Sequence, residues 1–306
     1  IIEVPPGVNQ DEASIGYTAY SLIQTGKDEY GKPFPLSFQS FGDWKLPLYV
    51  YITIPFVKMF GLTELAVRLP SALAGIATIG LTFFLVRYFF TSDLISFSSM
   101  ILLSLSPWHI HLSRVESESN LAVLFTVIAL LFFFKAIKKK PILLIGCALF
   151  FALTYFTYAG NHITTTLLVM GLLFIYRSKI PKSKYTIISV AIFSIMAGFI
   201  LFQTLQQADR TKLSGISIFG NPAVIHEKIE IPRNRFPNPN AWYVRLRYNR
   251  IMFAIETITK NYVLSFGPEF LFINGGTNHA HNIQNFGNLY IVEAPFFYLG
   301  IILLFL

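Results

Sequence analysis

The chain has 306 residues, of which 54% are hydrophobic and only 13% are charged, and its formal net charge is +8. Soluble domains carry about 25% charged residues, so this composition excludes an ordinary soluble protein and indicates a membrane protein. The single cysteine, Cys147, excludes a disulfide framework and a cysteine-based metal site. We expect both ends to be cuts through a longer protein, because the chain begins with Ile1 and stops inside an apolar run.

The first feature along the chain is an acidic pair, Asp11 and Glu12, just ahead of an apolar stretch at 15–23. At a membrane boundary, such a carboxylate could take the proton from an attacking hydroxyl group. The pair could also simply mark the start of a helix, where acidic residues interact favourably with the helix dipole. The sequence leaves both interpretations open.

Residues 46–61 form the next apolar element, LPLYVYITIPFVKMFG, and Lys45 precedes it. The element is shorter than the roughly 20 residues of a spanning helix and contains Pro55 and Lys58, so we predict a helix that lies in the membrane interface. A flat helix leaves the acidic pair on the same side as the later outer connectors, whereas a crossing helix would separate them. Lys45 could bind a lipid-linked phosphate, or could merely reach the lipid headgroups.

Seven apolar segments are candidates for membrane-spanning helices: 69–88, 93–112, 119–137, 141–158, 161–176, 185–203 and 289–306. The predicted fold class is therefore all-α, a polytopic membrane helix bundle. We predict four parts, namely an outer segment with a juxtamembrane helix (1–68), transmembrane helices (69–203), a long outer loop (204–288) and a last transmembrane helix (289–306).

Basic residues gather in alternate connectors between these segments. They are Arg87, Lys135, Lys138, Lys139, Lys140, Arg177, Lys179, Lys182 and Lys184. The positive-inside rule makes this side cytoplasmic, so the other connectors and the long loop face outward. We interpret the net positive charge as a topology signal and a source of phosphate partners, not as a nucleic-acid-binding surface.

A second acidic cluster, SRVESESN at 113–120, falls in an outer connector. Arg114 and Glu118 are four residues apart and would meet on one helix face. Glu116 adds another carboxylate at a membrane boundary, where charges are costly and often functional. The alternative is an ion pair that only caps a helix.

Two histidine pairs, His109 with His111 and His279 with His281, have a spacing that could hold a metal ion in a strand. No acidic partner pattern accompanies either pair, so no metal site is predicted. Nucleotide-binding motifs are also missing from the sequence. We therefore predict no cofactor, and leave dependence on a divalent metal open.

Four stretches, in this order, carry a resemblance to a known family. They are DEASIGYTAYSLIQTGKDEYG (11–31), FGDWKLPLYVYITIPFVKMFGLTELAVRLPSAL (41–73), SPWHIHLSRVESESNLA (106–122) and FGPEFLFINGG (266–276). The chain resembles membrane-embedded glycosyltransferases of the GT-C fold, and is similar to bacterial members of the protein O-mannosyltransferase and aminoarabinose transferase family. It departs from aminoarabinose transferases at Ser14, Trp44 and His162. The resemblance therefore implies a glycosyltransferase, but does not imply that aminoarabinose is the sugar transferred.

The resemblance also implies roles for individual residues. Asp11 would be the catalytic base. Glu12 beside it and Glu118, the acid of the second outer loop, are also predicted to be catalytic. Lys45 would bind the phosphate of the carrier, and we expect Arg114 to assist it.

Glu116 and His162 are expected to contact the substrate. The predicted function is that of an inverting glycosyltransferase at the outer face of the cell membrane. It would move a monosaccharide from undecaprenyl or dolichyl phosphate to a hydroxyl group of a glycan, lipid or protein. The alternative is a lipid or glycolipid transporter or flippase, whose typical internal repeat and polar residues deep within spans we do not find in the sequence.

Overall fold

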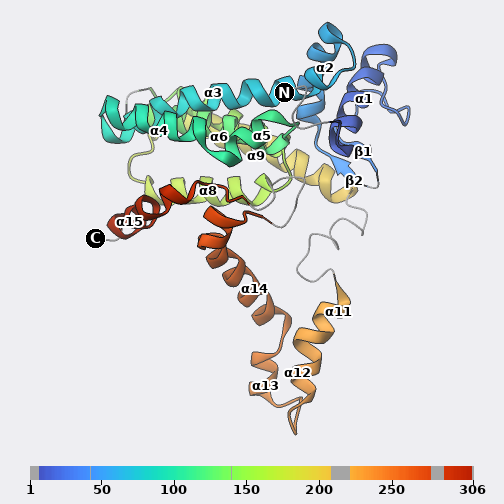
Figure 1. Cartoon of the computed structure of the whole chain (residues 1–306), viewed down its shortest axis with the longest axis vertical. Coiled ribbons are helices and arrows are strands. Elements are labelled where there is room, and N and C mark those ends of the chain that lie inside the picture. The colour runs from blue at the N-terminus through green and yellow to red at the C-terminus, as the bar shows by residue number, and fades with distance from the viewer. Residues whose placement is uncertain (1–6, 42, 139, 208–220, 277–285, 305–306) are drawn as a thin grey trace. The chain divides into compact units, whose positions relative to one another are not determined.

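The computed structural model describes residues 7–41, 43–138, 140–207, 221–276 and 286–304. The chain divides into two compact units, Ile1–Leu205 and Gln206–Leu306, and each is described by itself. Figure 1 labels the helices and strands of both units.

Helix α1 (Gln10–Thr25) opens the first unit. It begins there because the Asn9 side chain accepts a hydrogen bond from the Glu12 backbone N–H, at 2.8 Å, while the Asn9 backbone N–H donates to the Glu12 carboxylate. This reciprocal pair is a capping box. The helix ends at Gly26, whose φ of 68° is a left-handed conformation that favours glycine.

A short antiparallel hairpin leads from α1 to the next helix. Strand β1 (Phe38–Ser40) pairs with strand β2 (Asp43–Lys45), and the register places Phe38 opposite Lys45. Helix α2 (Pro47–Phe60) follows directly and packs against α1 and α3. The hairpin therefore ends at Lys45, two residues before α2, and the Lys45 side chain contacts Asp11 of α1.

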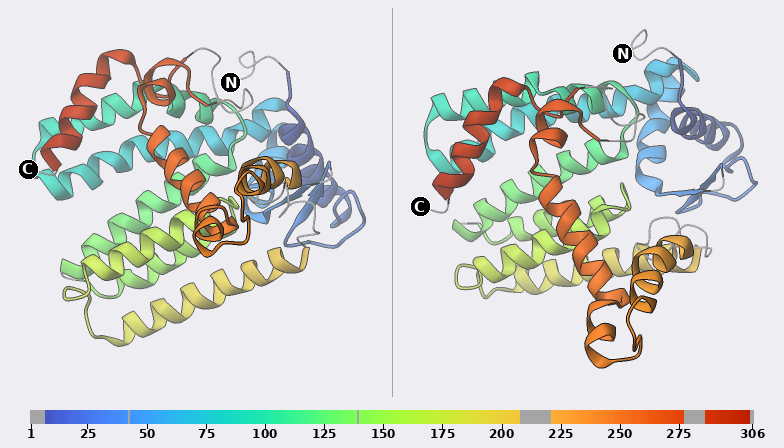
Figure 2. Two further views of the ribbon diagram at one scale, coloured as in Figure 1. Left: turned by 90° about the horizontal axis from the view of Figure 1, so that it is seen from below. Right: turned by 60° about the horizontal axis from the view of Figure 1, so that its bottom comes forward.

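Seven helices complete the first unit. They are α3 (Glu64–Phe90), α4 (Asp93–Leu105), α5 (Pro107–Arg114), α6 (Glu118–Lys138), α7 (Leu143–Tyr155), α8 (Asn161–Ile175) and α9 (Lys184–Gln207). Helix α6 packs against both α3 and α7, and α4 packs against α3. The two views of Figure 2 show these helices as a bundle with roughly aligned axes.

Three of the described helices are long and apolar enough to cross a membrane, namely Glu64–Phe90, Glu118–Lys138 and Lys184–Gln206. Five other apolar helices are shorter, at 10–17 residues. The prediction of one continuous span over 93–112 is wrong, because Ser106 is extended and Pro107 starts a new helix. Proline suits the first turn of a helix, where no backbone N–H donor is needed.

One end of the first unit is aromatic and basic. Tyr88, near the end of α3, stacks on Phe134 of α6 with ring centroids 5.0 Å apart, and Tyr176, just after α8, contacts the same Phe134. The Lys138 ammonium lies 3.9 Å from the centre of the Tyr88 ring. The basic connectors that follow α3, α6 and α8 therefore meet at one end of the bundle.

The second unit consists mainly of short helices. They are α11 (Pro222–Ile225), the π-helix η1 (His226–Glu230), α12 (Ile231–Asn234), α13 (Trp242–Arg247), α14 (Arg250–Leu264), the π-helix η2 (Glu269–Ile273), the 3₁₀-helix η3 (Ile291–Glu293) and α15 (Ala294–Leu304). The segment predicted as a long loop thus contains helices over most of its described residues.

Candidate active site

Glu12 is the centre of a buried network at the end of the first unit opposite the basic connectors. Its side chain is 2% exposed, and that of Arg68 on α3 is 0% exposed. The Arg68 guanidinium donates to both carboxylate oxygens, with Nε to Oε1 at 2.6 Å and Nη2 to Oε2 at 2.9 Å. The backbone N–H of Glu116 adds a third hydrogen bond, 3.1 Å from Oε1. Glu12 therefore joins α1, α3 and the α5–α6 connector.

The same network controls the charge of Glu12. Burial alone would raise its pKa, but the hydrogen bonds from Arg68, Asn9 and Glu116 outweigh burial and hold the pKa of this carboxyl below its ordinary value. Glu12 is accordingly a carboxylate whose two oxygens are both occupied.

Asp11, the preceding residue, has a different setting. Its side chain is 52% exposed, and its Oδ1 atom lies 2.7 Å from the Nζ atom of Lys45, which is only 10% exposed. Successive helical residues point about 100° apart, so Glu12 faces the helix bundle while Asp11 is exposed. Asp11 is thus an accessible carboxylate beside a fixed ammonium group.

Two more acids surround Lys45. Burial lowers the pKa of the Lys45 ammonium, but the charges of Glu116 and Glu118 and the hydrogen bond to Asp11 more than reverse this, so its pKa lies above the ordinary lysine value. Burial and the neighbouring Glu118 raise the pKa of the Glu116 carboxyl well above its ordinary value, although Lys45 acts in the opposite direction. The Oε1 atom of Glu116 has no hydrogen-bond partner among the described residues. Glu116 therefore has one carboxyl oxygen that no described residue occupies.

The connector that carries these acids is held by Asn120, which is fully buried. Its side-chain N–H₂ group donates to Ser71 on α3, at 2.9 Å to the carbonyl oxygen and 3.1 Å to the hydroxyl, and to the Ser113 hydroxyl at 3.3 Å. The close approach needs a glycine, because a Cβ atom at Gly75 would overlap the Ser113 side chain. Packing against α3 therefore places the 115–118 segment over Glu12.

The expectation that Arg114 and Glu118 share one helix face is wrong. Arg114 is the last residue of α5 and Glu118 is the first of α6, and the backbone between them is extended at Val115. The half-buried Arg114 side chain makes no hydrogen bond or ion pair with any residue that the structure describes.

The structure describes the surroundings of His162 and His109. His162, at the start of α8, stacks on Tyr155 and its Nε2 atom is 2.9 Å from the Tyr155 carbonyl oxygen. Tyr155 in turn packs with Leu46, the residue after Lys45. His109 is buried, with Nε2 3.3 Å from the Gly75 carbonyl oxygen. The pair at 279 and 281 lies outside the described residues.

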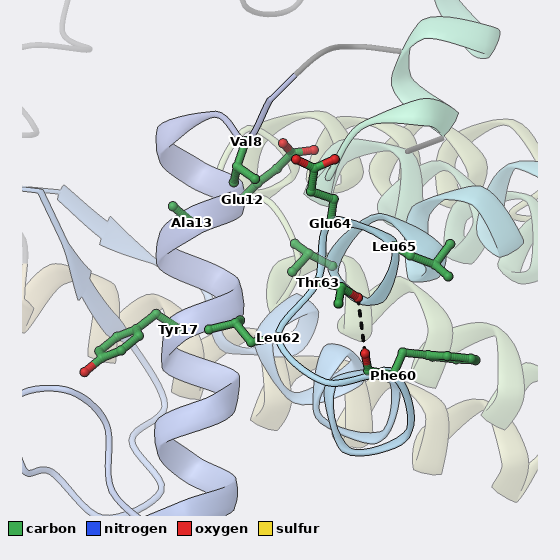
Figure 3. Close-up of a pocket in the computed structure, with 10 residues that line it drawn as sticks. Val8, Glu12, Ala13, Tyr17, Phe60, Leu62, Thr63, Glu64 and Leu65 are labelled. Atoms are coloured by element: carbon green, nitrogen blue, oxygen red, sulfur yellow. Dashed lines mark hydrogen bonds between the residues drawn. The ribbon is translucent and has the colours of Figure 1, made fainter. Parts of the chain in front are cut away.

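A cavity of about 820 Å³ lies between α1 and the α2–α3 connection. Figure 3 shows the carboxylates of Glu12 and Glu64 close together at one end, with Phe60 and Leu62 further along the lining. Its volume is within the range of small-ligand sites. Since the lining is mostly apolar, the cavity suits the apolar part of an amphiphilic ligand.

Arg68 is the residue of this site to which the sequence interpretation gave no role. It stood within an apolar segment, in the Arg-Leu-Pro-Ser stretch at the start of a predicted span. A charged residue in such a position usually has a buried partner, which was the available signal. Its partner, 56 residues away, emerges only from the packing of α1 on α3.

The family model described as dolichyl-phosphate-mannose-protein mannosyltransferase matches residues 45–205, just over half of the chain. Among solved structures, ArnT from Cupriavidus metallidurans in the apo state matches with a TM-score of 0.53 at 13% sequence identity. The match covers 81% of this chain and 49% of that chain, so this chain spans about half the length of that protein. At this identity the likeness shows the fold alone, and it confirms the predicted all-α GT-C membrane fold. No curated protein sequence matches the chain.

Proposed function

The chain belongs to the dolichyl-phosphate-mannose-protein mannosyltransferase family, and on this premise we propose that it transfers a monosaccharide from a polyprenyl-phosphate carrier to a hydroxyl group. The observation that carries the proposal is the accessible Asp11 carboxylate, 2.7 Å from the nearly buried ammonium of Lys45 at the start of an apolar helix. A base and a phosphate-binding cation are the two groups that such a reaction needs.

Asp11 acts as the base in a single displacement. The acceptor oxygen attacks the anomeric carbon, the bond from that carbon to the phosphate oxygen breaks, and Asp11 takes the proton of the acceptor hydroxyl. The carrier leaves as a polyprenyl phosphate monoester, and the configuration at the anomeric carbon inverts. A sugar-linked phosphate is already a good leaving group, so the reaction needs no general acid.

Lys45 stabilises the charge that develops on the departing phosphate. Without ligand its ammonium group is paired with Asp11. A donor phosphate competes for the same ammonium group and so releases Asp11 to accept a proton. Binding of the donor thereby prepares the base.

The remaining acids take supporting roles. The buried Glu116, whose Oε1 has no hydrogen-bond partner among the described residues, is the acid that we expect to contact the sugar. Glu118 adds negative charge beside Lys45. Glu12 and Arg68 hold α1 in position and do not react. Arg114 and His162 remain predicted ligands of the donor phosphate and the substrate, respectively.

The orientation in the membrane follows from the two ends of the first unit. The basic connectors gather at one end, and the positive-inside rule assigns that end to the cytoplasm. The acidic site then faces outward, with α2 lying in the interface. The apolar cavity between α1 and the α2–α3 connection would hold the apolar part of the carrier.

The test uses purified full-length protein in liposomes with a radiolabelled sugar on a polyprenyl phosphate. A transferase releases unlabelled carrier phosphate and leaves the label on an acceptor hydroxyl group. If the intact donor only crosses the bilayer and no label is transferred, the protein is a transporter and the proposal is wrong.

A further inference from the structure

A second cavity, of about 270 Å³, lies entirely within the second unit. Its polar lining comes from two stretches of the chain, 230–233 and 245–250, and consists of Glu230, Arg233, Arg245, Tyr248, Asn249 and Arg250. Three arginines thus line one small cleft, which we call the arginine cleft. The proposed transfer reaction makes no use of it.

The positive charge of the arginine cleft is only partly neutralised from within, because three arginines and one acid, Glu230, line it. The Arg233 guanidinium donates to two neutral acceptors, the carbonyl oxygen of Pro239 at 3.0 Å and the side-chain oxygen of Asn240 at 2.9 Å. The side chains of Arg245 and Arg250 form no hydrogen bond or ion pair with any residue described in the structure.

Acidic groups near the arginine cleft are few. The Glu230 carboxylate is already engaged by the His226 ring, with Nδ1 and Oε2 2.6 Å apart. From 231 to 250 the sequence contains five arginines and no acidic residue. Guanidinium groups match phosphate oxygens in geometry as well as charge, so the cleft suits a phosphate group.

An exposed apolar surface adjoins these arginines. Helix α14 begins at Arg250 and has no buried residue, and Ile251, Ile255, Ile258 and Tyr262 are all exposed along it. Their spacing of four, three and four residues places them on one helix face. Such an apolar face next to basic residues is typical of helices that lie in a membrane interface.

Helix α13 also carries exposed apolar side chains next to these arginines. Trp242 is 77% exposed, and Tyr243 and Leu246 are also exposed. Tryptophan and tyrosine favour the headgroup level of a bilayer, where one part of the ring is in apolar surroundings and the polar atom meets water. The two helices thus offer aromatic and aliphatic side chains on either side of Arg245 and Arg250 in sequence.

We propose that the arginine cleft binds the phosphate of an anionic phospholipid and so docks α13 and α14 on the lipid surface. The charge selects an anionic headgroup, and the exposed side chains of both helices enter the interface beside it. A polyprenyl phosphate shares the phosphate chemistry, and inorganic phosphate lacks the apolar part, so the experiment includes both.

The test measures lipid retention by the full chain in a neutral detergent, using native mass spectrometry during titration with phosphatidylglycerol or phosphatidylcholine. The double variant Arg245→Gln/Arg250→Gln should weaken retention of phosphatidylglycerol by roughly 30-fold, because each basic residue at a lipid surface contributes about fivefold. Weak retention of phosphatidylcholine should not change.

The matched control is Arg235→Gln/Lys260→Gln, which removes the same charge from two exposed residues of the second unit that do not line the cleft. It should retain phosphatidylglycerol nearly as the unmodified chain does. Equal loss of phosphatidylglycerol retention in both double variants would show that only general charge attraction holds the lipid. That result would overturn the proposed binding in the cleft.

Two further titrations, with undecaprenyl phosphate and with inorganic phosphate, show which phosphate-containing ligand the cleft binds. Undecaprenyl phosphate retained through the cleft in place of phosphatidylglycerol would make it a carrier site and overturn the proposal. Inorganic phosphate that displaces the lipid at equal concentration would also overturn it. Quenching of Trp242 fluorescence by brominated phosphatidylglycerol, lost in the cleft variant and kept in the control, would support docking on the lipid surface.

Discussion

Asp11 and Glu12 are adjacent on one helix, yet they belong to two regions of opposite character. Glu12 lies in a closed region in which Arg68 and the Glu116 backbone occupy both of its oxygens. Asp11 lies in an open region where it is 52% exposed and meets a single ammonium group. The closed region builds the site, and the open region is available to a substrate.

The difference follows from helix geometry. In the first turn of α1, Glu12 faces α3 and completes the capping box, whereas Asp11 faces away from α3. A sequence motif of two acids therefore combines a structural group with a reactive one. Substitutions should separate the two by their effects on unfolding and on turnover.

The largest effect on stability is expected from Arg68→Met. This change leaves the Glu12 carboxylate buried without its partner, which typically costs about 3–5 kcal/mol in the free energy of unfolding. Arg87→Met is the control on the same helix, because Arg87 and Asp93 form an exposed ion pair and such pairs contribute about 0–1 kcal/mol. Thermal unfolding in detergent measures both, and equal losses would contradict a closed region at Glu12.

A large effect on activity is expected from Lys45→Gln. Removing a preorganised positive group that stabilises transition-state charge typically lowers turnover by about 10²–10³-fold. Lys32→Gln is the control in the same N-terminal segment, since the exposed Lys32 lies over the Trp44 ring and forms no ion pair with the described residues. Initial rates with a polyprenyl-phosphate sugar compare the two, and an active Lys45→Gln variant would remove the phosphate-binding role.

Acid titration should show opposite slopes for Glu12 and Glu116. The pKa of Glu12 is lowered in the folded state, so its contribution is present above the ordinary value of about 4.3 and is lost as pH falls through the folded-state pKa. The pKa of Glu116 is raised, so stability falls as pH rises from about 4.3 toward its folded-state pKa.

Melting temperatures measured from pH 3 to pH 8 test these slopes, which for one proton reach about 1.4 kcal/mol per pH unit in the free energy of unfolding. Glu12→Gln should lose the first slope, and Glu116→Gln the second. Unchanged profiles in both variants would contradict the two environments.

The smallest effect on stability is expected from Arg114→Gln. This side chain makes no hydrogen bond or ion pair with the part of the chain that the structure describes, so the free energy of unfolding should change by less than about 0.5 kcal/mol. A larger loss would reveal a structural role. A rise in the KM for the donor at unchanged stability would support the predicted contact with phosphate.

The membrane class and the all-α fold could be predicted because apolar runs and basic connectors are local signals. The acids and Lys45 could also be singled out, since each stands at the edge of an apolar segment. The Arg68–Glu12 pair could not, because it depends on how α1 packs on α3 across 56 residues of sequence. The break at Ser106 and Pro107, which ends α4 and starts α5, was readable in principle from the proline.

The helices of the second unit show another limit. Its amphipathic helix α14 was hidden within a segment predicted as a loop, since its apolar residues are spaced along one face and form no continuous run. The exposure of that face emerges only from the structure.

The central claim is that Asp11 takes the proton of the acceptor. The turnover of Asp11→Asn with a radiolabelled polyprenyl-phosphate sugar tests it most directly, with the melting temperature measured on the same sample. We expect turnover to fall by about 10²–10⁴-fold while the melting temperature stays close to that of the unmodified chain, because Asp11 is exposed. Undiminished turnover in a folded Asp11→Asn protein would contradict the claim.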